Sequence, residues 1–139
     1  MTEIPPDLIS AYKTTDFRVL EPEAFTLRIG QQSDKLQALF HASGANCAAF
    51  LTAWNPYSEQ TTDAENERLQ SELTKRLLLE GFVTARGLGA DPSGEWPGEE
   101  SLFVLGLDLA RAKSFGKHFR QNAVVWADAD AVPQLVLLR

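Results

Sequence analysis

The order of apolar segments after residue 46 restricts the fold of this chain more than any other feature. An apolar run, Cys47 to Trp54, is followed by a helical pattern, two more apolar runs, a second helical pattern and a short run near residue 125. Short apolar runs bounded by turn residues are typical of strands, so the order predicts strand, helix, strand, strand, helix, strand. This is the split β-α-β arrangement of ferredoxin-like folds. We therefore expect an α+β protein with a ferredoxin-like core over residues 47–128 and a mostly antiparallel sheet.

Local patterns predict the bounds of the core elements. Thr62 and Glu65 have the spacing of a capping box, which predicts the start of the longer helix, and Gly81 predicts its end. The other expected core elements are strands at Phe82–Leu88, Leu102–Leu107 and Ala123–Trp126, a helix from Leu109 to Phe119, and a loop over 91–100 rich in Pro and Gly.

Further elements are expected outside this core. They are a helix from Ile4 to Tyr12, a strand from Phe25 to Ile29, a helix from Ser33 or Asp34 to Ser43-Gly44, and a last strand from Gln134 to Leu138. Pro133 favours an edge position for the last strand, because proline cannot donate to a sheet. The central strands are apolar on both faces, so we expect the N-terminal helices to cover the second face.

Size and composition indicate an ordinary globular protein. With 139 residues, 44% hydrophobic and 23% charged, the chain is expected to form a single domain, 1–139. Cys47 is the only cysteine, so an internal disulfide is excluded. The net charge of −6 argues against a nucleic-acid partner. No apolar stretch has membrane-spanning length and no signal pattern is present, so we expect a cytoplasmic protein with no membrane partner.

The predicted topology gathers polar segments that are far apart in the sequence. In a split β-α-β sheet, the end of the Cys47–Trp54 strand lies beside the starts of its two antiparallel neighbours. That places Trp54-Asn55-Pro56 near Glu99-Glu100-Ser101 and Gln121-Asn122, with the first turn of the longer helix at the same end. The candidate ligand-binding residues are Trp54, Asn55, Glu65, Asn66, Trp96, Glu100, Gln121 and Asn122.

Each candidate also has a purely structural interpretation. Glu99 and Glu100 are adjacent in an extended segment and face opposite sides, so only one of them can enter a pocket. Asn66 lies inside a helix, where Asn is an indifferent former, and local structure explains it least well. Trp54 and Trp96 could line a pocket or cover an edge of the hydrophobic core.

A metal site is the weaker interpretation of the acidic residues. Glu65 with Glu100 or Asp91 could provide oxygen ligands for magnesium or calcium. A solvated acidic loop and a helix cap explain the same residues, and that interpretation is favoured. No histidine has zinc-ligand spacing. We therefore predict no metal and no cofactor.

Several short motifs carry a resemblance to a known family. They are Ala11-Tyr12, Leu27-Arg28-Ile29-Gly30, Thr52-Ala53-Trp54-Asn55-Pro56, Glu65-Asn66, Trp96 with Glu99-Glu100-Ser101, and Gln121-Asn122-Ala123. With these motifs the chain resembles the bacterial family DUF3293 over nearly its whole length. The resemblance implies that the polar segments are part of the family's signature. The family has no known function, so the resemblance implies no activity.

Three classes of function stay open. The first is a small module that binds a small polar ligand or acts as a regulator, with its site at one end of the sheet. The second is a hydrolase-like enzyme that uses Glu65 or Glu100 as a general base or as a ligand of a divalent metal. The third is a protein-interaction module that forms a homodimer through the edge strand Gln134–Leu138. The sequence does not decide whether the protein is an enzyme.

Overall fold

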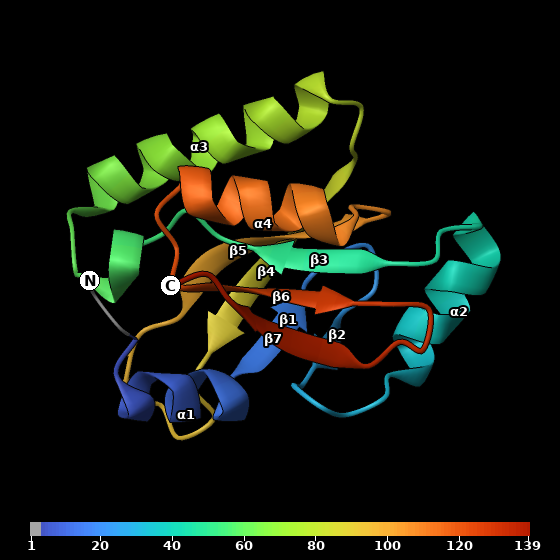
Figure 1. Ribbon diagram of the computed structural model, residues 1–139, viewed down its shortest axis with the longest axis horizontal. Helices are drawn as coiled ribbons and strands as arrows, with labels where there is room; N and C mark the ends of the chain where they lie inside the picture. Colours follow the sequence, from blue (N-terminus) through green and yellow to red (C-terminus); the bar gives the residue numbers. More distant parts are fainter. Residues whose placement is uncertain (1–3) are drawn as a thin grey trace.

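One curled, antiparallel sheet of seven strands organises the chain (Figure 1). It is described here from a computed structural model, and the description covers residues 4–139. The strand order is β2-β1-β4-β5-β3-β6-β7. The strands are β1 (Asp16–Val19), β2 (Phe25–Leu27), β3 (Ala48–Leu51), β4 (Thr84–Ala90), β5 (Glu99–Leu105), β6 (Ala123–Ala127) and β7 (Pro133–Leu137). The helices are α1 (Pro6–Thr14), α2 (Asp34–Ser43), α3 (Asp63–Leu79) and α4 (Leu109–His118), with a short 3-10 turn η1 (Pro56–Ser58).

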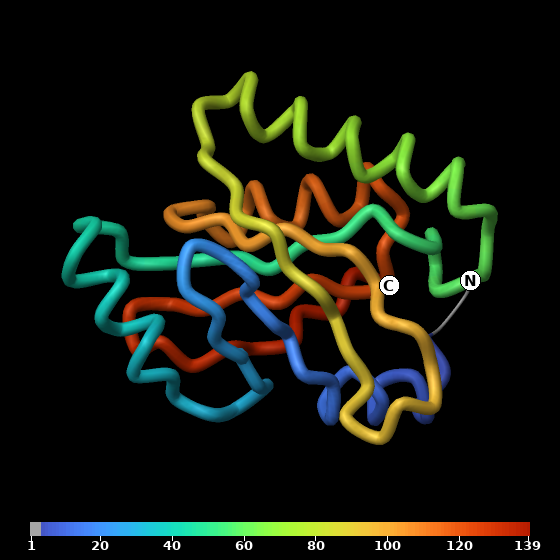
Figure 2. Tube along the Cα trace, turned by 180° about the vertical axis from the view of Figure 1, so that it is seen from behind, coloured from blue at the N-terminus to red at the C-terminus, as the bar shows by residue number. Residues whose placement is uncertain are grey.

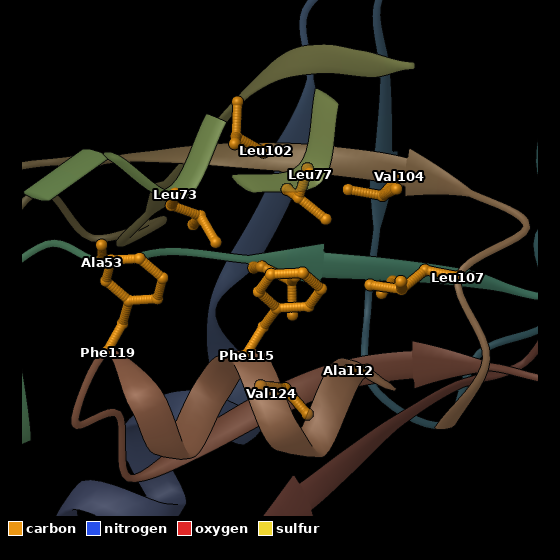
Figure 3. Packing of buried hydrophobic residues seen from close by; sticks show 12 residues of the cluster. Ala53, Leu73, Leu77, Leu102, Val104, Leu107, Ala112, Phe115, Phe119 and Val124 are labelled. Atoms are coloured by element: carbon orange, nitrogen blue, oxygen red, sulfur yellow. The ribbon is translucent and has the colours of Figure 1, made fainter. Parts of the chain in front are cut away.

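The larger hydrophobic core lies between one face of the sheet and the helices α3 and α4. Leu73 and Leu77 from α3 are at most 1% exposed, and Phe115 of α4 and Phe119, directly after α4, pack into the same cluster. Figure 3 shows these side chains converging over β3 and β5. Because strand residues alternate between faces, β5 contributes Leu102 and Val104 to this side.

A second core occupies the opposite face of the sheet. Leu36 and Phe40 of α2 pack there against Phe50 of β3 and Phe103 of β5. Helices therefore cover both faces, as the apolar character of the central strands predicts. Helix α1 lies away from α2, beside the loop that joins β4 to β5 (Figure 2).

Polar side chains begin three of the helices. Ser33, Thr62 and Asp108 each accept a hydrogen bond from a backbone amide three residues later. The cap at Thr62 confirms half of the predicted capping box. The other half is wrong, because the Glu65 carboxylate pairs with Arg68, at 2.6 Å, instead of reaching back to the cap.

Most predicted elements are confirmed with shifted ends, and one strand was not predicted. Strand β1, Asp16–Val19, pairs with β2 and β4 and is too short to stand out as a pattern. Strand β3 ends at Leu51, earlier than predicted. It ends there because the following backbone groups bond to side chains and no longer to a neighbouring strand. The amide of Ala53, for example, donates to Oε1 of Gln70 at 2.9 Å. Strand β7 lies at an edge of the sheet, as Pro133 predicts.

Candidate functional site

A cavity of about 330 Å³ lies between α1 and the face of the sheet that also carries the second core. Helix α1 contributes Leu8, Ala11 and Tyr12 to its wall, and the sheet contributes mainly Phe17, Phe50, Gly89, Ser101 and Val125. Trp54, Trp96 and Glu99 come from segments at the end of the sheet. Cavities of this size, mostly apolar with a few polar groups, are typical of small-molecule sites.

Small residues in β4 and β5 leave space on this face of the sheet. Gly87 lies opposite Ser101, and Gly89 lies opposite Glu99. A Cβ atom at Gly87 would come within 2.7 Å of the Phe50 ring, so that ring packs directly against the strand backbone. A Cβ atom at Gly89 would make only ordinary contacts, the nearest at 3.9 Å. The absence of a side chain at Gly89 therefore adds to the cavity volume.

Glu99 places a half-buried carboxyl group in the wall of the cavity. Burial raises the pKa of Glu99 above its ordinary value, and a hydrogen bond from Asn55 works in the opposite direction. In that bond, Nδ2 of Asn55 donates to Oε2 of Glu99 at 3.1 Å. Glu100, the glutamate chosen as a candidate from the sequence, is exposed and does not line the cavity. The alternation of β5 puts Glu99 on the cavity side with Ser101.

Asn55 and Asn66 form a polar bracket that holds the loop after β3. Oδ1 of Asn66 accepts from the backbone amide of Asn55 at 2.8 Å, and Nδ2 of Asn66 donates to Oδ1 of Asn55 at 2.8 Å. The same Oδ1 of Asn55 accepts from the amide of Thr61 at 3.2 Å. Asn66 is fully buried and lies outside the cavity lining. Its amide positions Asn55 and is not free to contact a ligand.

The loop stabilised by this bracket contains unusual backbone geometry. Asn55, Tyr57 and Ser58 have φ values of 46°, 55° and 61°. Outside glycine such conformations cost about 1–3 kcal/mol each and persist only where surrounding contacts fix them. Here the amide of Tyr57 donates to the carbonyl of Arg120 at 2.7 Å, and Oγ of Ser58 lies 2.7 Å from the Tyr12 hydroxyl. The loop is thereby tied to both α1 and the end of α4.

Gln121 and Asn122 complete the polar end of the sheet. Nε2 of Gln121 donates to the carbonyl of Trp54 at 3.3 Å, and Gln121 lines the cavity. Nδ2 of Asn122 donates to the Tyr12 hydroxyl at 3.2 Å and to Oγ of Ser58 at 3.1 Å. Asn122 is 2% exposed, and its Oδ1 has no hydrogen-bond partner within residues 4–139.

The structure divides the predicted site residues into two groups. Trp54, Asn55, Trp96 and Gln121 line the cavity. Asn66, Asn122, Glu65 and Glu100 do not. Glu65 lies in a separate surface groove with its partner Arg68. The ligand-binding role of the first group stays a prediction.

Several residues of the cavity wall were not predicted as site residues. For Glu99 the available signal was the alternation of side chains along a strand. Glu99 and Ser101 are two residues apart, so they face the same side of the sheet. Ala11 and Tyr12 of α1 belong to a motif of the family resemblance, but no sequence pattern fixes where an N-terminal helix docks, so neither they nor Leu8 and Thr15 were placed at the site.

The acidic segments do not assemble metal ligands. Across residues 4–139, no three side chains of His, Cys, Asp or Glu gather closely enough to hold a metal ion. The Asp91 carboxylate accepts hydrogen bonds from Ser93 and from the amide of Glu95 within its own loop. The hydroxyl of Ser93 is the main cause of the lowered pKa of Asp91.

Within residues 4–139, no helix is both long and apolar enough to cross a membrane.

Residues 51–124 match the model of a protein family described as "Protein of unknown function (DUF3293)". Comparisons with curated proteins and with solved structures gave no match. The matched range begins at the end of β3 and runs into β6. It therefore includes the loop after β3 that contains Asn55, and also α3, Glu99 and α4. Since the match covers more than half of the chain, the protein belongs to the DUF3293 family.

Proposed function

We propose that this protein binds a small molecule with an apolar body and one polar end in the cavity beneath α1. The observation that carries the proposal is a half-buried carboxyl group, that of Glu99, in an otherwise mainly apolar wall. Desolvating a carboxylate costs free energy, and titratable groups with such perturbed pKa values concentrate at functional sites. The positive φ angles of the adjoining loop support the same location, because backbone strain also concentrates at such sites.

A blocked cavity tests this proposal. Gly89→Val would place two methyl groups in the cavity, whereas Thr84→Val changes the same strand at a position outside the cavity lining. A fragment library would be screened by ligand-observed NMR against the wild type and both variants. We expect a set of fragments that bind the wild type and Thr84→Val but not Gly89→Val. Fragments that bind Gly89→Val equally well, or no binding fragment at all, would contradict the proposal.

An enzyme with a carboxylate base is a second candidate, and the raised pKa of Glu99 favours it over other carboxylates. A general base works best when its pKa is close to the operating pH. Glu65 is held by Arg68 and Glu100 is exposed, so Glu99 is the carboxylate that we propose for this role. Hydrolysis of p-nitrophenyl esters by the wild type, lost in Glu99→Gln with an unchanged circular dichroism spectrum, would support it. Equal rates in both proteins would refute it.

The edge strand β7 supports a third candidate, pairing between two copies of the chain. β7 is the last strand of the sheet, and Leu137 on it is 44% exposed. Unpaired strand edges can add a strand from another chain. Light scattering at increasing protein concentration would show a dimer that Leu137→Lys abolishes. A monomer at every concentration would exclude this candidate.

We also infer that residues 47–128 form a ferredoxin-like unit within one domain. The strand order β4-β5-β3-β6, with α3 and α4 packed on one face, supports the inference. The two hydrophobic cores share the same strands, which supports a single cooperative unit. Coincident urea unfolding curves from fluorescence and circular dichroism are expected, and two separate transitions would contradict this.

A further inference from the structure

The charge of the cavity wall restricts the class of ligand. Within residues 4–139, the residues that line the cavity include one acidic side chain, Glu99, and no Lys, Arg or His. Tyr12 is the other titratable group in the wall. A carboxylate or phosphate ligand would find no cation there and would be repelled by Glu99. Anionic ligands are therefore disfavoured.

The carboxylate of Glu99 has unused capacity to bind a donor. No Lys, Arg or His within residues 4–139 forms an ion pair with it. Asn55 donates to Oε2, and Oε1 has no hydrogen-bond partner in that part of the chain. An ionised carboxylate accepts several hydrogen bonds, and a partly buried one gains most from a cationic donor.

Aromatic side chains surround the same space. Phe17, Phe50, Trp54 and Trp96 all line the cavity. The faces of aromatic rings attract cations, and tryptophan does so most strongly. A single carboxylate combined with several aromatic rings is chemically suited to an ammonium group attached to an apolar body.

We propose that the ligand is an organic cation, a primary or methylated amine on a ring-sized apolar body, with its ammonium group at Glu99. The proposal rests on the proposed binding function and names the class of ligand for that cavity. A neutral ligand would leave the partly desolvated carboxylate with the hydrogen bond from Asn55 but without a charged partner, whereas an ammonium ion offers both charge and hydrogen-bond donors.

Three probes with one apolar body test the charge preference. They are 2-phenylethylamine, 2-phenylethanol and phenylacetate, titrated into the 139-residue protein at pH 8 by isothermal calorimetry. We expect the amine to bind at least tenfold more tightly than the alcohol, a difference of about 1.4 kcal/mol. Phenylacetate should bind more weakly than either.

Two glutamine variants provide the matched comparison. Glu99→Gln removes the cavity charge and keeps an acceptor for Asn55, while Glu100→Gln makes the same chemical change on the exposed neighbour. We expect Glu99→Gln to reduce the amine-to-alcohol preference to about one without changing alcohol affinity more than twofold. Glu100→Gln should behave as the wild type. Circular dichroism would verify that both variants fold.

The outcomes separate this inference from the proposed function. If the alcohol binds and the amine has no advantage, the cation proposal is overturned while the cavity remains a binding site. A preference for phenylacetate, or an amine preference that survives Glu99→Gln, also overturns it. If none of the three probes binds, the cation proposal fails for ring-sized ligands. The fragment screen with Gly89→Val then decides separately whether the cavity binds any molecule.

Discussion

Replacement of Asn66 by alanine should destabilise the fold strongly, although the change lies outside the cavity. The side chain is fully buried and makes two hydrogen bonds to Asn55, each 2.8 Å long. Each such bond contributes about 1 kcal/mol net to stability. Removing them costs about 2 kcal/mol before the groups left behind are considered.

The partner atoms on Asn55 are affected unequally. Its Oδ1 keeps the hydrogen bond from the amide of Thr61, so it stays satisfied. Its backbone amide loses its acceptor in a partly buried position, which adds about 1–3 kcal/mol. Alanine is a better helix former than asparagine, and this difference raises the unfolding free energy by about 0.5 kcal/mol. The net loss of unfolding free energy is therefore about 2.5–4.5 kcal/mol, a large part of the total stability of a small domain.

Urea unfolding followed by circular dichroism and by tryptophan fluorescence measures this loss. Glu67→Ala is the control, because Glu67 is an exposed residue next to Asn66 on the same helix. We expect Glu67→Ala to stay within about 0.5 kcal/mol of the wild type. A double-mutant cycle of Asn66→Ala with Asn55→Gly should show a coupling of about 1 kcal/mol, since one bond joins the two side chains. A loss below about 1 kcal/mol for Asn66→Ala would refute the reasoning that the bracket is a structural element.

Three further predictions concern β4, the cavity carboxylate and a helix cap. Gly87→Ala should destabilise the protein by about 1–3 kcal/mol in urea unfolding, because the new methyl group collides with Phe50, whereas Gly89→Ala should be nearly neutral. Burial raises the pKa of Glu99, so the folded state binds its proton more tightly than the unfolded state does, and stability falls as pH rises through that range. Glu99→Gln should therefore have a higher melting temperature than the wild type at pH 7–8, and the difference should shrink towards pH 4. Asp108→Ala removes the side-chain acceptor at the start of α4 and should cost about 1 kcal/mol, while Asp108→Asn, which keeps an acceptor, should cost less.

Sequence patterns predicted the elements better than they predicted the cavity. Helix starts at Ser33 and Thr62 follow from capping chemistry that acts within four residues, so they were predictable. The shared location of Asn55, Glu99 and Gln121 follows from antiparallel pairing of β3 with β5 and β6. These relations depend only on local sequence and strand order.

The remaining features depend on contacts that no local pattern contains. The position of α1 over the sheet is fixed by hydrogen bonds of Tyr12 with Ser58 and Asn122, far away in the sequence. No local pattern indicates that Asn66 hydrogen-bonds both the backbone amide and the side chain of Asn55, eleven residues earlier in the sequence. The choice between Glu99 and Glu100 needed only the alternation of β5, with Ser101 on the cavity side.

The polar groups at this end of the sheet differ in what they do for stability. Asn55 and Asn66 satisfy each other and favour the folded state. Within residues 4–139 the carboxyl group of Glu99 has one hydrogen bond, and its raised pKa means that its ionised form opposes folding near neutral pH. A cation bound at Glu99 would favour the ionised carboxylate, so the pKa of Glu99 should fall when the ligand binds. Binding measured at a pH where the free protein is partly protonated should then release protons to the buffer. Calorimetric titrations in two buffers of different ionisation enthalpy would detect that release, and Glu99→Gln should remove it.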